Sequence, residues 1–314
     1  MFLKCTAEGI GMRILYLAPE ISIPGSHGGA AHVMGTLASS TRLGHQVVAV
    51  VKKGHGQRFV EKGKHLSILR MPTWDVVGIK QICYFLNSLL VCFFLLFGRK
   101  IDLVYERGRI FGGVGVMMAY LFRVKSVYEM NEPYPDLPVM LGTHAPDSFL
   151  AWIIRRWHQA AVKRATLVTV THASLIEHGL APQENSKVIV HGADVNAFAS
   201  ASGKRIRKDY HLEGKFIVLY TGSFAPWHAC EQLIRAVARV VENNKDILFL
   251  MVGKGGQYEH CKALVRALGV EKQVLFPGEV LFHDIPSYVA AADVCVALFD
   301  RSYPPFQKYS FFFC

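Results

Sequence analysis

Small and polar residues follow a predicted strand in the second half of the chain, where they could bind a phosphate group. Gly222 and Ser223 come directly after the apolar run 215–221, and His228 stands just before the next predicted helix. Glycine lets the backbone approach a ligand closely, and a helix N-terminus favours an anion. His228 would add positive charge only when protonated, since its reference pKa is about 6.5. The turn is a candidate phosphate site, although a single histidine here is more often a helix cap or a surface residue.

Two further turns in this half repeat the arrangement. Gly253 and Lys254 stand between an apolar run and a predicted helix. Gly278, Glu279 and Val280 follow the next apolar run, and the backbone of such a turn could hydrogen-bond the flat edge of a base. One glycine turn is weak evidence of a site. Three turns that each follow a predicted strand favour a nucleotide-like ligand.

A glycine-rich loop also occurs near the start of the chain. The apolar run 13–19 leads to Gly28 and Gly29, which open a predicted helix over 28–44. The free N–H groups of a helix N-terminus would make this a second anion site. The loop matches neither G-x-G-x-x-G nor a Walker sequence, so a plain strand-to-helix turn remains an alternative.

Short apolar runs alternate with segments of helix length along most of the chain. The predicted strands are 13–19, 46–51, 66–71, 102–106, 126–130, 166–171, 215–221, 246–253, 273–278 and 293–299. The predicted helices are 28–44, 82–97, 112–122, 147–164, 230–243, 257–268 and 284–291. This alternation predicts an α/β fold, with parallel sheets covered by helices on both faces.

The strand pattern restarts after a stretch of small and basic residues at 199–208. We therefore expect two Rossmann-like domains, residues 12–203 and 204–314, preceded by a disordered leader at 1–11. Ligands of such sheets bind outside the carboxyl ends of the strands. A cleft between the two carboxyl ends is the expected site.

Composition narrows the classes of partner and location. The chain is 51% hydrophobic and 19% charged with a formal net charge of +11, which indicates a globular protein with anionic ligands. Its basic residues are scattered and form no nucleic-acid-binding motif, so nucleic acid is not an expected partner. The seven cysteines form no C-x-x-C, which predicts reduced thiols and no metal site. The start is too short and polar for a signal peptide, so we expect a cytoplasmic protein.

The segment 82–97 is strongly apolar, and basic residues flank it. A spanning helix needs about 20 residues, whereas these sixteen reach only about 24 Å. We therefore expect a buried or interfacial helix. Peripheral contact with the inner face of the membrane is the interfacial alternative.

These motifs, taken in order, resemble those of family-4 glycosyltransferases, which have the GT-B fold. The resemblance is carried by "PGSHGGAAHVMGTLASSTRLGHQVVAVV", "DLVYERGR", "VYEMNEPYPD", "KVIVHGADVNAF", "YTGSFAPWHACEQLIRAV" and "FPGEVLFHDIPSYVAAADVCVAL". It covers residues 12 to about 305. It implies transfer of a sugar, with retention, from a nucleotide-diphosphate donor to a glycan or lipid-linked acceptor. It implies no metal or other cofactor.

The resemblance also implies site residues. The donor-binding residues would be Gly28, Gly29, Gly222, Ser223, His228, Gly253, Lys254, Gly278, Glu279 and Val280. Ser223 and His228 stand where many members carry Arg and Lys. Asn131 stands where several members have a histidine facing the reaction centre, and His191 where Asn is common. Asn131 and Glu132 are the candidate catalytic residues, and Glu129 is expected to have a structural role.

Members of the family carry a pair of glutamates in a helix beyond the position of Cys314. We therefore expect a second domain that is incomplete, an aromatic end at 309–314 without its partners, and impaired activity. Two other functions stay open. One is a non-catalytic fragment that binds sugar nucleotides or a membrane surface. The other is a different GT-B enzyme, such as a sugar-nucleotide epimerase.

Overall fold

The computed structural model describes residues 11–25, 27–74, 76, 79–98, 100–136, 145, 147–300 and 302–303. The expected leader, apart from Gly11, and the aromatic end at 309–314 lie outside these residues. The chain divides into two compact units. Among the described residues, the first unit holds those from Gly11 to Pro24 and from His32 to His191, and the second holds Gly25–Ala31 and those from Gly192 to Tyr303.

The second unit begins at Gly192, ahead of the boundary expected after residue 203. The reason is packing, because helix α7 (Val195–Ala199) contacts α11 (Ile285–Ala291). Gly203 lies so close to the same helix that a Cβ atom there would stand 2.4 Å from Cα of Ala291. The small residues at 199–203 therefore belong to the second unit.

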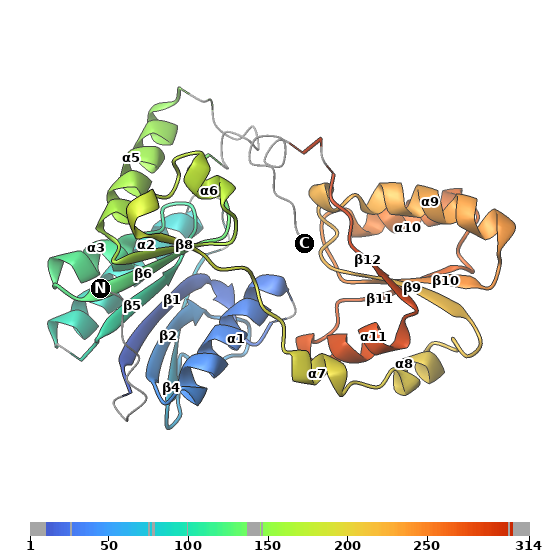
Figure 1. Ribbon diagram of the computed structural model, residues 1–314, viewed down its shortest axis with the longest axis horizontal. Helices are drawn as coiled ribbons and strands as arrows, with labels where there is room; N and C mark the ends of the chain where they lie inside the picture. The colour runs from blue at the N-terminus through green and yellow to red at the C-terminus, as the bar shows by residue number, and fades with distance from the viewer. Residues whose placement is uncertain are drawn as a thin grey trace. The chain divides into compact units, whose positions relative to one another are not determined.

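The first unit is built on an eight-stranded sheet in the order β3-β4-β2-β1-β5-β6-β7-β8 (Figure 1). The strands are β1 (Arg13–Ser22), β2 (Gln46–Lys52), β3 (Val60–Lys62), β4 (Leu66–Met71), β5 (Leu103–Arg107), β6 (Lys125–Met130), β7 (Leu167–Val170) and β8 (Ser186–Val188). All neighbours pair in parallel except β3, an antiparallel edge strand that the sequence did not predict.

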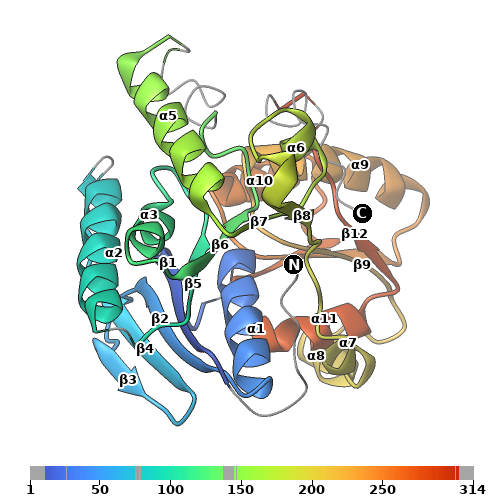
Figure 2. The ribbon, with the colours of Figure 1, turned by 60° about the vertical axis from the view of Figure 1, so that its left-hand side comes forward.

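Helices cover both faces of this sheet (Figure 2). They are α1 (Gly28–Arg42), α2 (Ile79–Phe97), α3 (Val114–Leu121), α5 (Phe149–Arg164) and the short α6 (Ser174–Glu177). A 3-10 turn, η1 (Gln183–Asn185), precedes β8. Helices α2 and α3 lie side by side, and their apolar side chains join those of β1, β2 and β5 in one buried cluster.

A buried carboxylate fixes the start of α3. Glu106, fully buried in β5, accepts hydrogen bonds from the backbone N–H groups of Gly113 at 2.7 Å and Val116 at 3.1 Å. A Cβ atom at Gly115 would stand 2.2 Å from Cδ1 of Leu17, so only glycine allows α3 this close to the sheet. Burial raises the pKa of Glu106, and Arg109 opposes that shift.

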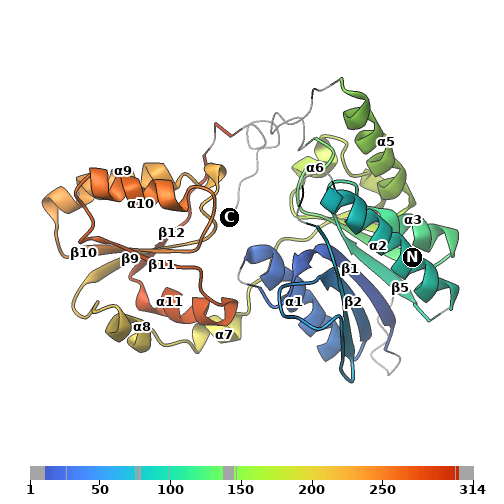
Figure 3. The same cartoon turned by 180° about the vertical axis from the view of Figure 1, so that it is seen from behind.

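The second unit has a four-stranded parallel sheet in the order β11-β10-β9-β12. Its strands are β9 (Phe216–Thr221), β10 (Ile247–Val252), β11 (Val274–Gly278) and β12 (Val294–Val296). Its remaining helices and 3-10 turns are α8 (Lys204–Asp209), η2 (Pro226–His228), α9 (Cys230–Asn243), α10 (Tyr258–Ala267) and η3 (Phe282–Asp284). Helices α9 and α10 cover one face, and α8 and α11 cover the other (Figure 3). The predicted α/β class with two Rossmann-like units is confirmed.

Helix α2 is apolar on two sides, but only one side is packed. Tyr84, Ser88, Val91, Cys92 and Leu96 are buried, whereas Ile82, Leu86, Leu90, Phe93, Phe94 and Phe97 are exposed. The sequence predicted a buried or interfacial helix, and the structure shows one side buried and the other side exposed. Among the described residues, no helix combines the length and the apolar character that crossing a membrane requires.

Candidate functional site

Three of the predicted glycines lie in one row at the carboxyl ends of β9, β10 and β11. The backbone N–H of Gly222 donates to the carbonyl of Val252 at 3.0 Å, and that of Gly253 donates to the carbonyl of Gly278 at 2.8 Å. These bonds extend the sheet past its last strand residues. The N–H groups of Gly222 and Gly253 are therefore occupied, and these two glycines act by allowing close packing.

The packing in this glycine row is tight enough to require glycine. A Cβ atom at Gly253 would stand 1.8 Å from the carbonyl oxygen of Gly222, and the φ angle there is +132°. Gly278 has φ +81°, and Gly255 has φ +159° with backbone atoms of Phe224 at 2.6 Å from the ideal Cβ position. The three turns are consequently held against one another, which presents their remaining backbone groups as one rigid surface.

His228 lies beside this row in the turn η2, just before α9. Its Nδ1 atom is 3.1 Å from the hydroxyl oxygen of Tyr220, and that hydroxyl donates to the carbonyl of Ser223 at 2.7 Å. Its ring also contacts the rings of Trp227 and Phe299. Burial lowers the pKa of His228, so this apolar setting opposes the protonated form that the sequence analysis required of a cation.

The other residues predicted to bind the sugar donor differ in the groups that they could use for binding. The side chains of Ser223, Lys254 and Glu279 are exposed beside the glycine row, whereas Val280 packs partly against the apolar cluster of α8 and α11. The carbonyl of Lys254 accepts from the N–H of Phe224 at 2.9 Å. Lys254 is thus the residue here with a fixed positive charge and an accessible side chain. Val280 has only its backbone to contribute.

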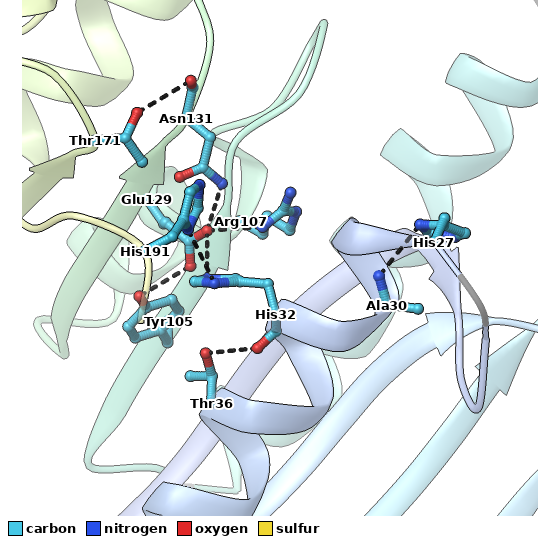
Figure 4. A network of polar contacts seen from close by, with 10 residues as sticks. All are labelled: His27, Ala30, His32, Thr36, Tyr105, Arg107, Glu129, Asn131, Thr171 and His191. Carbon is cyan, nitrogen blue, oxygen red and sulfur yellow. Dashed lines mark hydrogen bonds and ion pairs between the residues drawn. The ribbon is translucent and has the colours of Figure 1, made fainter. Parts of the chain in front are cut away.

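Gly28 and Gly29 form the first turn of α1. Gly28 is exposed, and a Cβ atom there would meet nothing within 4 Å. His27 caps this turn, because its carbonyl accepts from Ala30 at 2.9 Å and Ala31 at 3.1 Å, and its Nδ1 lies 3.2 Å from the N–H of Ala30 (Figure 4). Two of the N–H groups expected to be free are therefore used within the helix.

A second group of polar side chains gathers at the carboxyl ends of the first sheet, around Glu129 of β6 (Figure 4). Its Oε1 atom lies 2.8 Å from Nη1 of Arg107, 3.0 Å from Nε2 of His32 and within hydrogen-bonding distance of the Asn131 amide. Its Oε2 atom accepts from the Tyr105 hydroxyl at 2.9 Å. We call Glu129 and these four residues the Glu129 network.

The Glu129 carboxylate is ionised despite its burial, since only 5% of its side chain is exposed. Burial acts to raise its pKa, but the contact with His32 and the charges of His32 and Arg107 outweigh burial and lower the pKa to about 2. An ionised carboxylate can only accept hydrogen bonds, and four side chains surround this one. Glu129 is therefore a fixed negative charge at the end of the sheet.

The Glu129 network extends to two further residues. The backbone carbonyl of Asn131 accepts from the Thr171 hydroxyl at 3.2 Å, which ties β6 to the end of β7. Nδ1 of His32 lies 3.2 Å from Nδ1 of His191, and the two rings meet edge to face with centroids 4.8 Å apart. His191 is exposed.

This arrangement changes the roles expected from the sequence. Of the two candidate catalytic residues, Asn131 belongs to the Glu129 network, whereas Glu132, whose pKa is raised by burial, is not a member of it. His32 and Arg107 were not predicted at all. Arg107 and Glu129 are direct partners in the β5–β6 register. The charged residues at the ends of these two predicted strands could therefore have indicated the pair. In the described part of the chain, no group of three or more His, Cys, Asp or Glu residues could hold a metal ion.

Comparison with known proteins gives matches of two kinds. Residues 203–301 match the family model "Glycosyl transferases group 1". The 2-deoxystreptamine glucosyltransferase of Streptomyces kanamyceticus is 26% identical over 150 residues, which are 46% of this chain and 39% of that protein. The alpha-D-kanosaminyltransferase of the same organism is 28% identical over 101 residues, 32% of this chain and 26% of that protein. The chain thus spans well under half the length of these relatives.

Solved structures match over more of the chain. Sucrose-phosphate synthase from Thermosynechococcus elongatus has a TM-score of 0.68 at 18% identity, over 90% of this chain and 74% of that one. Anabaena HepE in complex with UDP-glucose has a TM-score of 0.64 at 18% identity, over 92% and 74% of the two chains. Both of these proteins show the fold alone. Together with the family match, they place a glycosyl transferases group 1 domain in residues 203–301 of a chain whose two Rossmann-like units are those of the GT-B fold.

Proposed function

We propose that this protein transfers a sugar from a nucleotide-diphosphate donor to a glycan or lipid-linked acceptor, with retention of the anomeric configuration. The observation that carries the proposal is that the glycosyl transferases group 1 match, residues 203–301, includes the whole glycine row. Anabaena HepE, which has the same fold, has been solved in complex with UDP and glucose and with UDP-glucose, which supports a nucleotide sugar as donor.

In this proposal the second unit binds the donor. The backbone groups of the glycine row that remain unpaired would bind the diphosphate and the base, and Lys254 would supply positive charge. The leaving diphosphate gains charge in the transition state, so donors fixed in advance stabilise it without further reorganisation. No metal is needed for these roles.

The first unit would bind the acceptor through the Glu129 network. A buried ionised carboxylate surrounded by hydrogen-bond donors is rigid. A sugar hydroxyl can hydrogen-bond to the accessible residues around that carboxylate. Asn131 and His191 are the members that remain accessible for such a contact. The role of the Glu129 carboxylate itself is to orient the side chains around it.

A lipid-linked acceptor would also explain the exposed side of α2. Five apolar side chains at helical spacing, Ile82, Leu86, Leu90, Phe94 and Phe97, are exposed on one helix of the first unit, and Lys100 is exposed just after it. An apolar helix face beside positive charge suits the interface of an anionic membrane. We therefore include peripheral membrane contact in the proposed function.

Nucleotide binding tests the donor side. Calorimetry with UDP, ADP and GDP should detect binding of at least one of them to the wild-type chain. Gly253→Ala should abolish that binding, because its Cβ atom would collide with Gly222. Gly256→Ala is the matched control in the same loop, since its Cβ atom would meet nothing within 4 Å and its affinity should stay within twofold. Equal loss in both variants, or no binding by the wild type, would refute the proposed donor site.

A further inference from the structure

An exposed histidine ends the Glu129 network. We propose that Glu129, His32 and His191 form a proton relay, and that its outer end, Nε2 of His191, takes the proton of an acceptor hydroxyl group. The identity of the acceptor rests on the transferase function proposed above, whereas the relay itself rests on contacts within the first unit.

The inner end of the relay fixes where the proton of His32 lies. Nε2 of His32 is 3.0 Å from Oε1 of Glu129, an ionised carboxylate that can only accept. The two atoms form a close contact and not an aligned hydrogen bond, but a bare nitrogen lone pair only 3.0 Å from that oxygen would be repelled, so we assign a hydrogen to Nε2 of His32. In the neutral ring, Nδ1 of His32 is then a lone pair.

The contact between His32 and His191 then determines the tautomer of His191. The two Nδ1 atoms of His32 and His191 are 3.2 Å apart, so one of them must donate. Because Nδ1 of neutral His32 has no hydrogen, His191 donates through its own Nδ1. Nε2 of neutral His191 is therefore bare, and it makes no hydrogen bond with any residue that the structure describes. The exposed ring thus presents a hydrogen-bond acceptor.

The relay can take up one proton in a balanced step. The O–H bond of the acceptor breaks as its proton moves to Nε2 of His191, and the oxygen keeps the electron pair with which it attacks the sugar. The new bond to the anomeric carbon forms as the bond from that carbon to the phosphate oxygen of the donor breaks, and the nucleoside diphosphate leaves with that second electron pair. The Nδ1 proton of His191 passes to Nδ1 of His32. The positive charge then lies on His32 beside the Glu129 carboxylate, where it is stabilised more than on the exposed ring.

The groups around His191 leave it unprotonated before the step. They are His32 on α1, Glu129 on β6, and Arg107 and Tyr105 on β5. Burial lowers the pKa of His191 and the charge of Arg107 lowers it further, whereas Glu129 raises it. The neutral ring that a base requires is therefore the prevailing form at pH 7 and above.

Nitrogen-detected or long-range ¹H–¹⁵N NMR of ¹⁵N-histidine-labelled protein tests the relay without any ligand. At pH 8, His191 should show the Nδ1–H tautomer, opposite to the Nε2–H form that free imidazole side chains favour. His32→Ala removes the acceptor and should return His191 to the Nε2–H form. The exposed His65 serves as the internal control and should show the Nε2–H form in both proteins. An Nε2–H tautomer of His191 in the wild type would overturn the relay.

Kinetics test its use in transfer, with hydrolysis of UDP-glucose, ADP-glucose or GDP-glucose as the probe and water as the acceptor. His191→Ala, His191→Gln and His32→Ala should each lower kcat by roughly 100-fold. Their affinity for the matching nucleoside diphosphate should stay within twofold, and His65→Ala should match the wild type. The wild-type rate should rise with pH as His191 loses its proton, and His191→Gln should lose that rise. Unchanged kcat in the His191 variants would overturn the proposal. If no nucleoside diphosphate binds, the transferase function fails, and the tautomer result still decides the relay.

Discussion

The carboxyl ends of the two sheets are built by the same fold rule but have opposite chemistry. In the first unit, β5 and β6 bring Tyr105, Arg107 and Glu129 together with His32 of α1, so charge is buried and paired. In the second unit, β9, β10 and β11 end in glycines, with backbone packed on backbone and aromatic rings nearby. Parallel topology thus fixes where a site forms, and the residues at the strand ends decide its chemistry.

The difference also separates two ways of building rigidity. The Glu129 network is rigid because each donor depends on one buried charge, so losing that charge leaves several groups unpaired. The glycine row is rigid because a side chain at Gly253 would collide with Gly222 and one at Gly278 would be strained by the positive φ angle there. The stability of the Glu129 network should therefore depend on pH, whereas the glycine row should be disrupted by a larger side chain at one of its glycines.

Removing the central charge should produce the largest effect. Glu129→Ala leaves the guanidinium of Arg107, which is 12% exposed, without its partner. We expect a loss of about 3–5 kcal/mol in the free energy of unfolding, measured by urea titration. The control is Glu231→Ala, which breaks exposed pairs with Arg235 and His260 and should cost far less, because solvent screens such pairs. Similar losses in both variants would remove the contrast between buried and exposed charge.

Acid should destabilise the first unit through the same residue. The folded pKa of Glu129 is about 2, below the unfolded value of about 4.3. Its contribution, about 3 kcal/mol, is therefore complete above the unfolded pKa and is lost as pH falls from about 4.3 toward 2. Urea unfolding of Glu129→Gln should depend less steeply on pH in this range than that of the wild type. Parallel curves would assign the acid sensitivity to other carboxylates.

Variants of His228 test whether anion binding by the second unit requires a protonated side chain. The Tyr220 hydroxyl has one proton and donates it to the Ser223 carbonyl, so Nδ1 of His228 must carry the hydrogen of their contact. Neutral His228 then has a bare Nε2, which repels phosphate, and binding through this ring requires protonation. UDP affinity should fall as pH rises, and His228→Ala should lose about 1–3 kcal/mol near pH 6.

Calorimetry in two buffers of different ionisation enthalpy measures the proton taken up with UDP. Wild type should take up a fraction of one proton near pH 7, and His228→Ala should take up none. His228→Lys should retain most of the affinity without the pH dependence. Equal affinities of wild type and His228→Ala from pH 6 to 8 would reduce His228 to a cap of α9.

The smallest effect concerns the outer surfaces of the two units. Leu90→Ser and Phe94→Ser on α2 should each weaken binding to phosphatidylglycerol vesicles by about 1 kcal/mol, measured by flotation. Val240→Ser on α9 is the control, since it removes an exposed apolar side chain from the second unit. Equal recovery of all three proteins and the wild type in the soluble fraction would contradict membrane contact through α2.

The sequence predicted most of the fold because its buried parallel strands are continuous apolar runs. Strands β2, β6 and β10 lie within one residue or so of their predicted bounds. Strands β3 and β8 were missed because each has three residues and little or no burial, so neither has an apolar pattern. The predicted run 293–299 shortens to β12 (Val294–Val296).

The two sites differed in how far they could be predicted. The glycine row was visible because each glycine directly follows its own strand. The Glu129 network was not, because His32, Arg107, Glu129 and His191 are far apart in the sequence and meet only through strand register and the path of α1. Local patterns identify a turn, whereas a network of this kind depends on topology.

The hydrogen bonds within the glycine row also determine how its amides exchange with solvent. The N–H groups of Gly222 and Gly253 donate to carbonyls in the same way as strand residues do, at 3.0 and 2.8 Å. Their deuterium uptake should therefore be as slow as that of β9 and β10, although both residues lie in turns. A slow-exchanging sheet that continues into its own binding loops leaves no mobile segment between the core and the ligand.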